Sequence, residues 1–593
     1  MKTTSNHKNR KIAIIGIGPR GGYALENFFE SLAKKTNELQ IHVYLFEQTG
    51  NFGNGQVYKT DQIESNWINI PERILLLKKR EAIKFSEIEI PSFPSYHEWT
   101  EKDFEERSKE AVDNYPPRAK IGKYLNERLA SIITPLHEHK IATLVKDTVK
   151  KVSLTENYKV SIATKTEDYH NLDEILLTIG HQPTEVSEQL LEWKEFASNK
   201  ENLALFTSPY PISDFLNHEK LTTKSIVGIR GFGLAMIDVA RAIAMRFGKF
   251  HIEDTKTRKC TFKPNENYKG KMIPFSLDGL PAVPKPLNAS IDDLFKPTET
   301  QLSDYESLIG NPETQKKASG VDFLLKAFAP IAAKMYLQLE TTYHTEKLSL
   351  KETENIIIKW LKDPEYKHDA ILSTDQSVKS IMQDFVAMAT GKKPISLDFC
   401  VGQVWRHCQP SMYAKLSFNE CDEDVFAEII ALDESTKRYS YGPPVESIQQ
   451  MIALIEANVL DMNFVSDPDF ELIDKGWKLS NNNNTETATV MLNSVLDAPK
   501  IKIVKSSIIE SLLSSDLIQI VHDDLGIMTD ENAYVISDDK KHNIPIALLG
   551  RLAKGTIIGV DAILECYGSR PKNWAKKASN RHILSVSGSD ISS

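Results

Sequence analysis

The chain has 593 residues, of which 41% are hydrophobic and 26% are charged, and its formal net charge is −9. This length predicts several domains, and the composition is ordinary for a globular protein. The acidic balance argues against nucleic acid as a partner, and without an apolar run of bilayer length we expect no membrane partner either. The polar start predicts no signal peptide. Five cysteines without a CxxC pair predict a reducing compartment, the cytoplasm, and the absence of HExxH or paired Cys/His spacing predicts no metal.

The first predicted element is an apolar strand over residues 11–15, which leads into a glycine turn and a helix. Gly16 permits the turn, Gly18 lets a pyrophosphate approach the backbone, and Gly21 lets the helix pack closely on the strand. The free N–H groups at the start of this helix attract phosphate. The pattern favours a dinucleotide site, and the alternative is a glycine turn in another kind of α/β protein.

A second predicted strand, residues 41–47, ends in a carboxylate. In dinucleotide folds an acidic residue at this point binds the ribose hydroxyls, which is the role we expect for Glu47. Gly50, Gly53 and Gly55 follow at the carboxyl end of the strand, where open α/β sheets bind ligands. A flexible surface loop is the alternative interpretation of this glycine-rich segment.

Arg118 precedes an amphipathic helix, and we expect it to pair with a phosphate or a carboxylate unless it is simply solvated. Residues 141–180 predict short strands with turns, an antiparallel insertion whose last strand returns to the dinucleotide sheet. That strand ends in Thr178 and Gly180. His181 comes next, and a lone histidine there is more typical of a structural hydrogen-bonding residue than of a catalytic one.

A second strand, glycine turn and helix begins near residue 225, with Gly231 and Gly233 in the turn. Met236 stands where the fingerprint has its third glycine, so this copy is weaker. Two such turns predict one tightly held nucleotide and one exchangeable nucleotide. The alternative is a single nucleotide site beside an unrelated α/β domain.

The next strand of this second domain is predicted at residues 272–276, which would direct Ser276 toward the adenosine ribose. An arginine here would favour the 2′-phosphate of NADPH, and only Arg258 or Lys285 could supply a comparable charge. Both NADPH and NADH therefore stay open as the nicotinamide donor, with a preference for NADPH.

Residues 290–460 have mainly helical spacing and could cover a substrate pocket, although most of these side chains are expected to be core. Residues 544–549 predict a C-terminal strand, followed by a glycine loop and a helix. We expect this strand to rejoin the first domain, with Gly555 and Thr556 facing the flavin and its pyrophosphate. A plain C-terminal helix is the alternative.

The predicted fold class is therefore α/β, with two Rossmann-like dinucleotide-binding domains and a largely helical insertion. The first domain is expected over residues 1–215, completed by 535–593, and the second over 216–290. Residues 291–534 would form the helical substrate region and the return to the first domain.

Seven motifs recur in order and carry a family resemblance. They are Gly16–x–Gly18–Pro–Arg–Gly21, Gly53–x–Gly55–x–x–Tyr58 with Asn69–Ile–Pro71, Pro117–Arg118–x–x–x–Gly122–x–Tyr124–Leu125, Thr178–x–Gly180–His181–x–Pro183, Gly231–x–Gly233–Leu–x–x–x–Asp238, Gly442–Pro–Pro444 and Leu549–Gly550–Arg–Leu–x–Lys–Gly555–Thr556. Together they resemble the bacterial FAD/NAD(P)-binding protein family, which is related to two-dinucleotide-domain flavin monooxygenases and amino-acid N-hydroxylases. The chain departs from many N-hydroxylases because it lacks a clear arginine after the second-domain strand.

The resemblance implies FAD on the first domain, NADPH or NADH on the second, and O2 with a small-molecule substrate as reaction partners. The residues expected at the cofactors are Gly16, Gly18, Pro19, Arg20, Gly21, Glu47, Gly55, Asn69, Arg118, Thr178, Gly180, His181, Gly231, Gly233, Ser276, Gly555 and Thr556. No catalytic side chain is identified. The leading hypothesis is a monooxygenase acting on an amine or other small molecule. An FAD-dependent oxidoreductase without oxygen insertion and a non-catalytic dinucleotide-binding protein are the alternatives.

Overall fold

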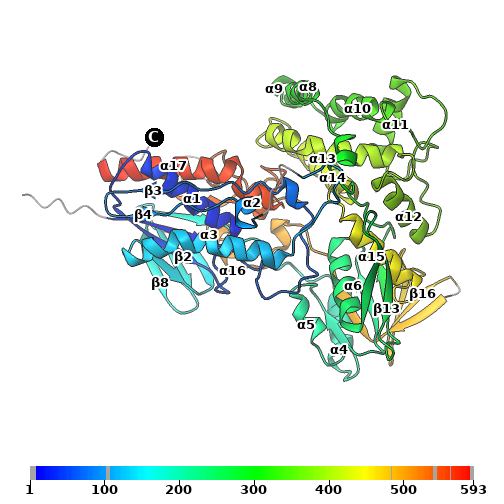
Figure 1. Cartoon of the computed structure of the whole chain (residues 1–593). Coiled ribbons are helices and arrows are strands. Elements are labelled where there is room, and N and C mark those ends of the chain that lie inside the picture. The colour runs from blue at the N-terminus through cyan, green and yellow to red at the C-terminus, as the bar shows by residue number, and fades with distance from the viewer. Residues whose placement is uncertain (1–8, 102–106, 483, 538–543, 561, 588–593) are drawn as a thin grey trace, which may run out of the picture.

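The computed structural model describes residues 9–101, 107–482, 484–537, 544–560 and 562–587. Figure 1 shows three parts: a first sheet with its helices, a second sheet with its own, and a group of helices beside the second sheet. The two sheets and the helical region match the expected α/β class with a helical insertion.

The first sheet is a five-stranded parallel sheet built around the first predicted strand. In sheet order its strands are β19 (Ile546–Leu548), β9 (Glu174–Leu177), β1 (Arg10–Ile15), β2 (Ile41–Phe46) and β5 (Ala142–Val145). The C-terminal strand β19 pairs with β9, so the prediction that it rejoins the first domain is confirmed.

Both faces of the first sheet are covered, because successive side chains of a strand point to opposite faces. Ile12 and Ile14 pack with α1 (Pro19–Ala33), α3 (Arg118–Glu138) and α17 (Ser569–Ser587), which lie together in Figure 1. Ala13 and Ile15 pack in a second core with β6 (Val149–Leu154), β7 (Val160–Thr164), β8 (Asp168–Leu172) and α16 (Ser507–Leu513).

The antiparallel insertion predicted at residues 141–180 is shorter than expected. β6, β7 and β8 form a three-stranded antiparallel sheet as predicted, but β5 pairs parallel with β2. α3 carries the chain back along the first sheet before β5 begins, and a crossover of this kind produces a parallel neighbour.

The second sheet has four parallel strands and extends beyond the predicted range 216–290 at both ends. In sheet order they are β10 (Ala204–Phe206), β18 (Val490–Asn493), β11 (Ile226–Arg230) and β14 (Lys271–Phe275), and α6 (Leu234–Phe247) follows β11. β10 and β18 are three and four residues long, too short to carry a readable period.

Several shorter strands and helices lie outside the two main sheets. They are β3 (Ile83–Lys84), β4 (Glu89–Ile90), the hairpin β12 (Gly248–Asp254) and β13 (Lys259–Pro264), the three-stranded sheet β15 (Asp469–Ile473), β16 (Gly476–Asn481) and β17 (Asn484–Ala488), and the helices α2 (Tyr96–Trp99), α4 (Glu188–Ser198) and α5 (Ile212–Leu216). Two 3₁₀ helices are η1 (Glu72–Ile74) and η2 (Ile501–Ile503).

The region between residues 289 and 456 is helical, as predicted. Its helices are α7 (Ala289–Asp293), α8 (Glu299–Ile309), α9 (Pro312–Lys316), α10 (Asp322–Leu337), α11 (Leu350–Lys362), α12 (Val378–Ala389), α13 (Leu397–Leu416), α14 (Glu423–Ser440) and α15 (Val445–Glu456). None of the helices in the described residues is long and apolar enough to cross a bilayer.

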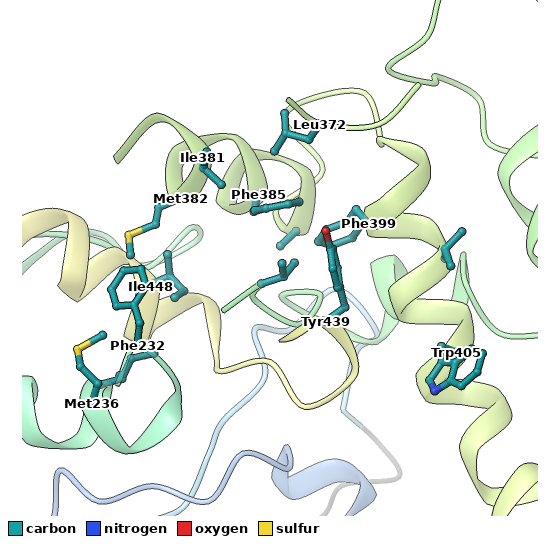
Figure 2. Packing of buried hydrophobic residues seen from close by; sticks show 14 of the residues in the cluster. Phe232, Met236, Leu372, Ile381, Met382, Phe385, Phe399, Trp405, Tyr439 and Ile448 are labelled. Atoms are coloured by element: carbon teal, nitrogen blue, oxygen red, sulfur yellow. The ribbon is translucent and has the colours of Figure 1, made fainter. Parts of the chain in front are cut away.

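The helical region and the second sheet share one hydrophobic core. Figure 2 shows Phe232 and Met236, at the second glycine turn, close to Ile448 of α15 and Met382 of α12. The same core continues through Phe385 to Trp405 on α13. The second sheet is thus anchored to the helices by direct packing.

The prediction of a helix directly after the C-terminal glycine loop is wrong for the described residues. β19 is followed by the 3₁₀ helices η3 (Arg551–Ala553) and η4 (Ile563–Tyr567), and α17 begins only at Ser569. The backbone from η3 onward forms hydrogen bonds with other segments of the chain. The Thr556 carbonyl accepts from Phe418 N–H at 2.9 Å, and the Leu552 carbonyl accepts from Ile527 N–H at 2.7 Å. Those bonds replace the ones a helix would make.

Candidate functional site

The first glycine turn leaves no room for side chains. Gly16 has φ +89°, and a Cβ there would lie 2.6 Å from the carbonyl oxygen of Thr178. The Thr178 hydroxyl in turn donates a hydrogen bond to the Gly16 carbonyl. Thr178, at the end of β9, therefore fixes the turn against the neighbouring strand.

The first turn of α1 is open to a ligand. Gly18 is its N-cap and supplies no side-chain hydrogen bond, and Pro19 follows at N1. A Cβ on Gly18 would have only Gly55 nearby, 3.6 Å from its Cα, so the glycine-rich loop lies over the same turn. A Cβ on Gly21 would be 2.6 Å from the Gly16 carbonyl oxygen, which explains the close packing of helix on turn.

Glu47 follows the last residue of β2 and is 7% exposed. Its Oε1 accepts from the Thr49 backbone N–H at 3.2 Å and from the Thr49 hydroxyl at 2.8 Å. Its Oε2 accepts no hydrogen bond from any residue that the structure describes. The carboxylate is thus held in one orientation with an oxygen left for a ribose hydroxyl.

Arg20 extends from α1 to the C-terminal segment. Its Nη2 donates to the Val560 carbonyl at 3.1 Å and lies 3.9 Å from Glu565 Oε2. A Cβ on Gly550 would come within 2.5 Å of Arg20 Nη1. Arg20 therefore ties the segment after β19 to the start of α1.

Gly555 and Thr556 do not start a helix, because they lie between the 3₁₀ helices η3 and η4. A Cβ on Gly555 would meet the side chains of Leu525 and Val521 at 3.0 Å. Thr556 Oγ1 accepts from the Thr529 N–H at 3.1 Å. Both residues join the C-terminal segment to residues 521–529.

Gly180 and His181 lie after β9, on the same side as the first turn. Gly180 has φ +64°, and a Cβ added to it would meet no atom within 4 Å, so its surroundings are open. The His181 ring lies 2.8–2.9 Å from Arg551 Nη1. This contact agrees with the hydrogen-bonding interpretation of His181.

The second glycine turn repeats the first. Gly231 has φ +109° and would bring a Cβ to 2.6 Å from Ser494 Oγ. Gly233 is the N-cap of α6 without a side-chain hydrogen bond, and a Cβ there meets nothing within 4 Å. Met236, which stands where the fingerprint has its third glycine, is 1% exposed and packs in the core of Figure 2. Ser276 follows β14, where its Oγ accepts from Gly279 N–H at 3.0 Å.

A buried ion pair joins α3 of the first sheet to α6 of the second. Arg118 Nη2 lies 3.0 Å from Asp238 Oδ2, and the Tyr210 hydroxyl donates to the same oxygen at 2.7 Å. The guanidinium carbon of Arg118 lies 5.2 Å from the Tyr210 ring centroid, and its Nε donates to the Trp67 carbonyl at 3.2 Å. Of the two partners predicted for Arg118, the structure shows a carboxylate.

Arg241 makes a second link between the same parts and was missed by sequence reasoning. Its guanidinium carbon lies 3.6 Å from the Trp67 ring centroid, and Nη1 donates to the Ser65 carbonyl at 2.7 Å. Nε donates to Gln450 at 2.7 Å. Burial lowers the pKa of Arg241 to about 10, so it stays cationic at neutral pH. The partners of Arg241 come from distant parts of the sequence, so no local sequence motif indicates these contacts.

Residues 13–182 match a family model described as FAD-NAD(P)-binding. The match covers β1, the first glycine turn, Glu47, Arg118 and the end of β9. This part of the chain is an FAD-NAD(P)-binding domain.

Comparison with known proteins adds a weaker set of likenesses. The chain is 25% identical over 282 residues to the uncharacterized protein YdhS of Escherichia coli, an alignment that covers 46% of each chain. A cyclohexanone monooxygenase variant from Rhodococcus sp. Phi1 bound to NADP+ is 11% identical, with 97% of this chain and 86% of that chain covered and a TM-score of 0.44. L-lysine 6-monooxygenase from Pseudomonas syringae is 12% identical over 97% of this chain and 100% of that chain, with a TM-score of 0.45. With TM-scores below 0.5, neither structure says what this chain does.

Asn69 connects the FAD-NAD(P)-binding domain to the helical region. Its Nδ2 donates to the Tyr441 carbonyl at 3.3 Å, and its own carbonyl accepts from Lys285 Nζ. The chain around Lys285 runs tightly along residues 441–443, since a Cβ on Gly442 would lie 1.7 Å from the Val283 carbonyl oxygen. Asn69 is therefore held at the meeting point of all three parts.

Asp292 of α7 binds two arginines and a histidine from the domain and the helical region at this meeting point. Arg73 Nη2 lies 2.7 Å from Oδ2, while Arg406 and His407 of α13 both bond to Oδ1, His407 at 3.1 Å. Burial alone would raise the pKa of Asp292, but Arg406, His407 and Arg73 together hold that pKa well below its usual range. Sequence reasoning missed this group because Asp292 lies 219 residues from Arg73 and 114 residues from Arg406.

The two turns fit dinucleotides. In each, a glycine with positive φ is enclosed by a neighbouring strand, while the next glycine opens the uncapped N-terminus of a helix. An uncapped helix N-terminus beside a glycine binds phosphate through its N–H groups and its dipole. Gly16, Gly18, Gly21 and Glu47 would hold FAD, and Gly231 and Gly233 would hold the nicotinamide nucleotide.

Proposed function

We propose that the chain is an FAD-dependent, NAD(P)H-consuming monooxygenase that hydroxylates a small molecule, with an amine nitrogen as the first candidate acceptor. The observation that carries the proposal is the presence of an open glycine turn in each of two parts of the chain, which the ion pair of Arg118 with Asp238 joins through α3 and α6. Hydride transfer would require two dinucleotides bound on these turns to meet at the junction between the sheets.

Bound FAD would supply the redox chemistry, taking a hydride from the nicotinamide and passing electrons to O2. The protein residues bind, orient and exclude water. Gly18 and Gly55 leave space for the pyrophosphate, Glu47 orients a ribose, and Asn69 fixes the loop between the sheets. The helical region contacts the junction through Tyr441, whose carbonyl accepts from Asn69 Nδ2.

A redox mechanism that uses a pair of cysteines finds no support in the described residues. Cys260, Cys400, Cys408, Cys421 and Cys566 are all free. Burial raises the pKa of each thiol, so none is a thiolate at neutral pH. The motif resemblance to flavin monooxygenases, rather than a thiol relay, therefore supports the choice of reaction.

A comparison of the NAD(P)H consumed, the O2 taken up and the hydrogen peroxide formed tests the proposal. The purified protein is loaded with FAD and given NADPH or NADH in air, and NAD(P)H loss, O2 uptake and hydrogen peroxide are followed with a panel of amines and amino acids. We expect one compound to raise NAD(P)H consumption while peroxide falls well below the NAD(P)H consumed. Peroxide equal to NAD(P)H with every compound would reassign the chain to an oxidoreductase without oxygen insertion.

A further inference from the structure

A cluster of charged residues around Asp292 is not absorbed by cofactor binding. It consists of Arg73, Asp113, Lys285, Asp292 and Arg406, and it lies between the FAD-NAD(P)-binding domain and the helical region. Through Lys285 it touches Asn69, the residue at the meeting point of the three parts. The cluster therefore borders the place where the two nucleotides would meet.

The charges of this cluster do not balance. Both oxygens of Asp113 accept from Arg73 Nε, at 2.9 and 3.1 Å, and both oxygens of Asp292 are used by Arg73, Arg406 and His407. Burial lowers the pKa of His407, which leaves it neutral at neutral pH. Three cations thus share two carboxylates, and neither carboxylate has an oxygen left over.

Lys285 is the cation left without a carboxylate. Its side chain is 8% exposed, and among the described residues its Nζ donates only to the neutral Asn69 carbonyl. Burial and then the charge of Arg406 lower the pKa of Lys285 to about 7, against the opposing effect of Asp292. A buried ammonium without a counter-ion is unfavourable, and a bound anion would remove that penalty.

The arginines beside Lys285 remain reachable from solvent. The side chains of Arg73 and Arg406 keep 21% and 14% of their surface exposed, and His407 keeps 17%. These side chains are paired and yet still in contact with solvent, which is the side from which an anion would approach them. Arginine is suited to such a site because its planar donors match a carboxylate.

We propose that Lys285 and Arg406 form a subsite for a carboxylate of the substrate, with Asp292 as the positioning residue that orients Arg406. This assignment rests on the proposed function and narrows it: the substrate is a small organic acid or an amino acid. A phosphate of the nicotinamide nucleotide is the other oxyanion that could reach the same donors, and the experiment separates the two.

Binding is measured by calorimetry on the FAD-loaded protein, which requires no turnover. The probes are succinate, glutarate and the twenty common amino acids, each acid paired with its amide or the corresponding amine. We expect at least one acid to bind and its uncharged partner to bind at least tenfold more weakly. Lys285→Met should weaken that acid tenfold or more and Lys285→Arg should restore part of the affinity, while Lys351→Met, an exposed lysine of α11, should change nothing.

Proton uptake separates direct contact with Lys285 from a structural effect. At pH 8.5 the free ammonium would be largely deprotonated, so binding an acid should take up about one proton. Lys285→Arg, which is always charged, should bind without uptake. Arg406 and Asp292 are the charged groups facing Lys285, and the pKa of Asp292 is held well below its usual range.

Three results would overturn the subsite. The first is equal binding of acids and their uncharged partners, or no binding of any acid. The second is unchanged acid binding in Lys285→Met with weakened NADPH binding, which assigns the anion to the nucleotide. The third is acid binding without proton uptake. None of these measurements depends on NAD(P)H oxidation, so a protein that binds acids without consuming NAD(P)H refutes the monooxygenase proposal alone.

Discussion

Gly16 is the residue on which the first nucleotide site depends most directly. Its φ of +89° disfavours any L side chain, and a Cβ would overlap the Thr178 carbonyl oxygen at 2.6 Å. Gly22, six residues on, has an ordinary φ and would bring its Cβ no closer than 3.6 Å to Leu129. The two glycines therefore form a matched pair for substitution.

We predict that Gly16→Ala loses FAD and Gly22→Ala retains it. The left-handed conformation alone costs an alanine about 1–2 kcal/mol, and the overlap with Thr178 would move the turn away from the phosphates. The ratio of flavin absorbance to protein absorbance after purification and dialysis measures the outcome. Full flavin content in Gly16→Ala would show that the phosphates do not rest on this turn.

The depressed pKa of Lys285 predicts a pH dependence of stability. In the unfolded chain this lysine titrates near its ordinary value, while in the folded protein its pKa is about 7. Between these values the unfolded state binds the extra proton, so the free energy of unfolding should rise with pH from 7 toward 10 by about 1.4 kcal/mol per pH unit at most. Below pH 7 both the folded and the unfolded state are protonated at this lysine, so the free energy of unfolding no longer depends on pH through Lys285.

Urea denaturation between pH 7 and 9 measures this effect. Lys285→Met should flatten the rise, and Lys351→Met should keep it because that lysine is exposed. The experiment is done without added acids, since a bound anion would raise the pKa of Lys285. Parallel pH profiles for wild type and Lys285→Met would mean that Lys285 is charged throughout.

At the level of elements, the contact between α3 and α6 sets how the two sheets meet. Arg118 and Asp238 each have a second partner, Trp67 and Tyr210 respectively, so the ion pair is part of a small network. Removing one partner leaves a largely buried charge, which is more costly than removing both. A double-mutant cycle isolates the pair from its surroundings.

We predict that Arg118→Ala and Asp238→Asn each destabilise the protein by about 1–3 kcal/mol and that the double variant costs less than their sum. Both single variants should also slow flavin reduction by NAD(P)H, because under the proposed function the second nucleotide would be bound at the start of α6. Denaturation and anaerobic stopped-flow absorbance give the two readouts. Asp214→Asn, an exposed residue of α5, is the control.

Additive losses from Arg118→Ala and Asp238→Asn, with unchanged flavin reduction, would contradict this role of the pair. That result would leave the Arg241 contact with Trp67 as the link that matters between the two parts.

Sequence reasoning succeeds for these elements where the signal is local. Gly16, Gly18 and Glu47 follow one another within a strand, a turn and the next strand, so their spacing alone places them together. It fails where the partner is distant in the chain: Asp292 collects Arg73 and Arg406 from segments that carry no shared pattern. The C-terminal helix was wrong because backbone bonds to residues 418 and 527 outweigh local preference.

In the whole molecule, the second sheet and the helical region share one core while the first sheet has cores of its own. Met236 of α6 and Phe328 of α10 belong to that shared core and are at most 1% exposed. Packing continuous across two parts of a chain makes them unfold together. The second sheet and the helical region are therefore expected to behave as one unit in unfolding, although they are separate parts of the fold.

We predict that Met236→Ala and Phe328→Ala shift the same unfolding transition, each by about 2–5 kcal/mol. Denaturation followed by hydrogen exchange of α6 and α10 tests this. Separate transitions, with each variant affecting only its own part, would show that the two parts are independent. Leu308, an exposed residue of α8, offers Leu308→Ala as a control with little expected effect.

The central claim is that two nucleotides act together on one chain. The most direct measurement is anaerobic stopped-flow absorbance of the FAD-loaded protein mixed with NADPH and, separately, with NADH. The account predicts that the flavin absorbance bleaches in a single exponential with at least one donor, at a rate that saturates with donor concentration. A protein that retains FAD but is not bleached by either donor, or one that takes up no FAD at all, would contradict it.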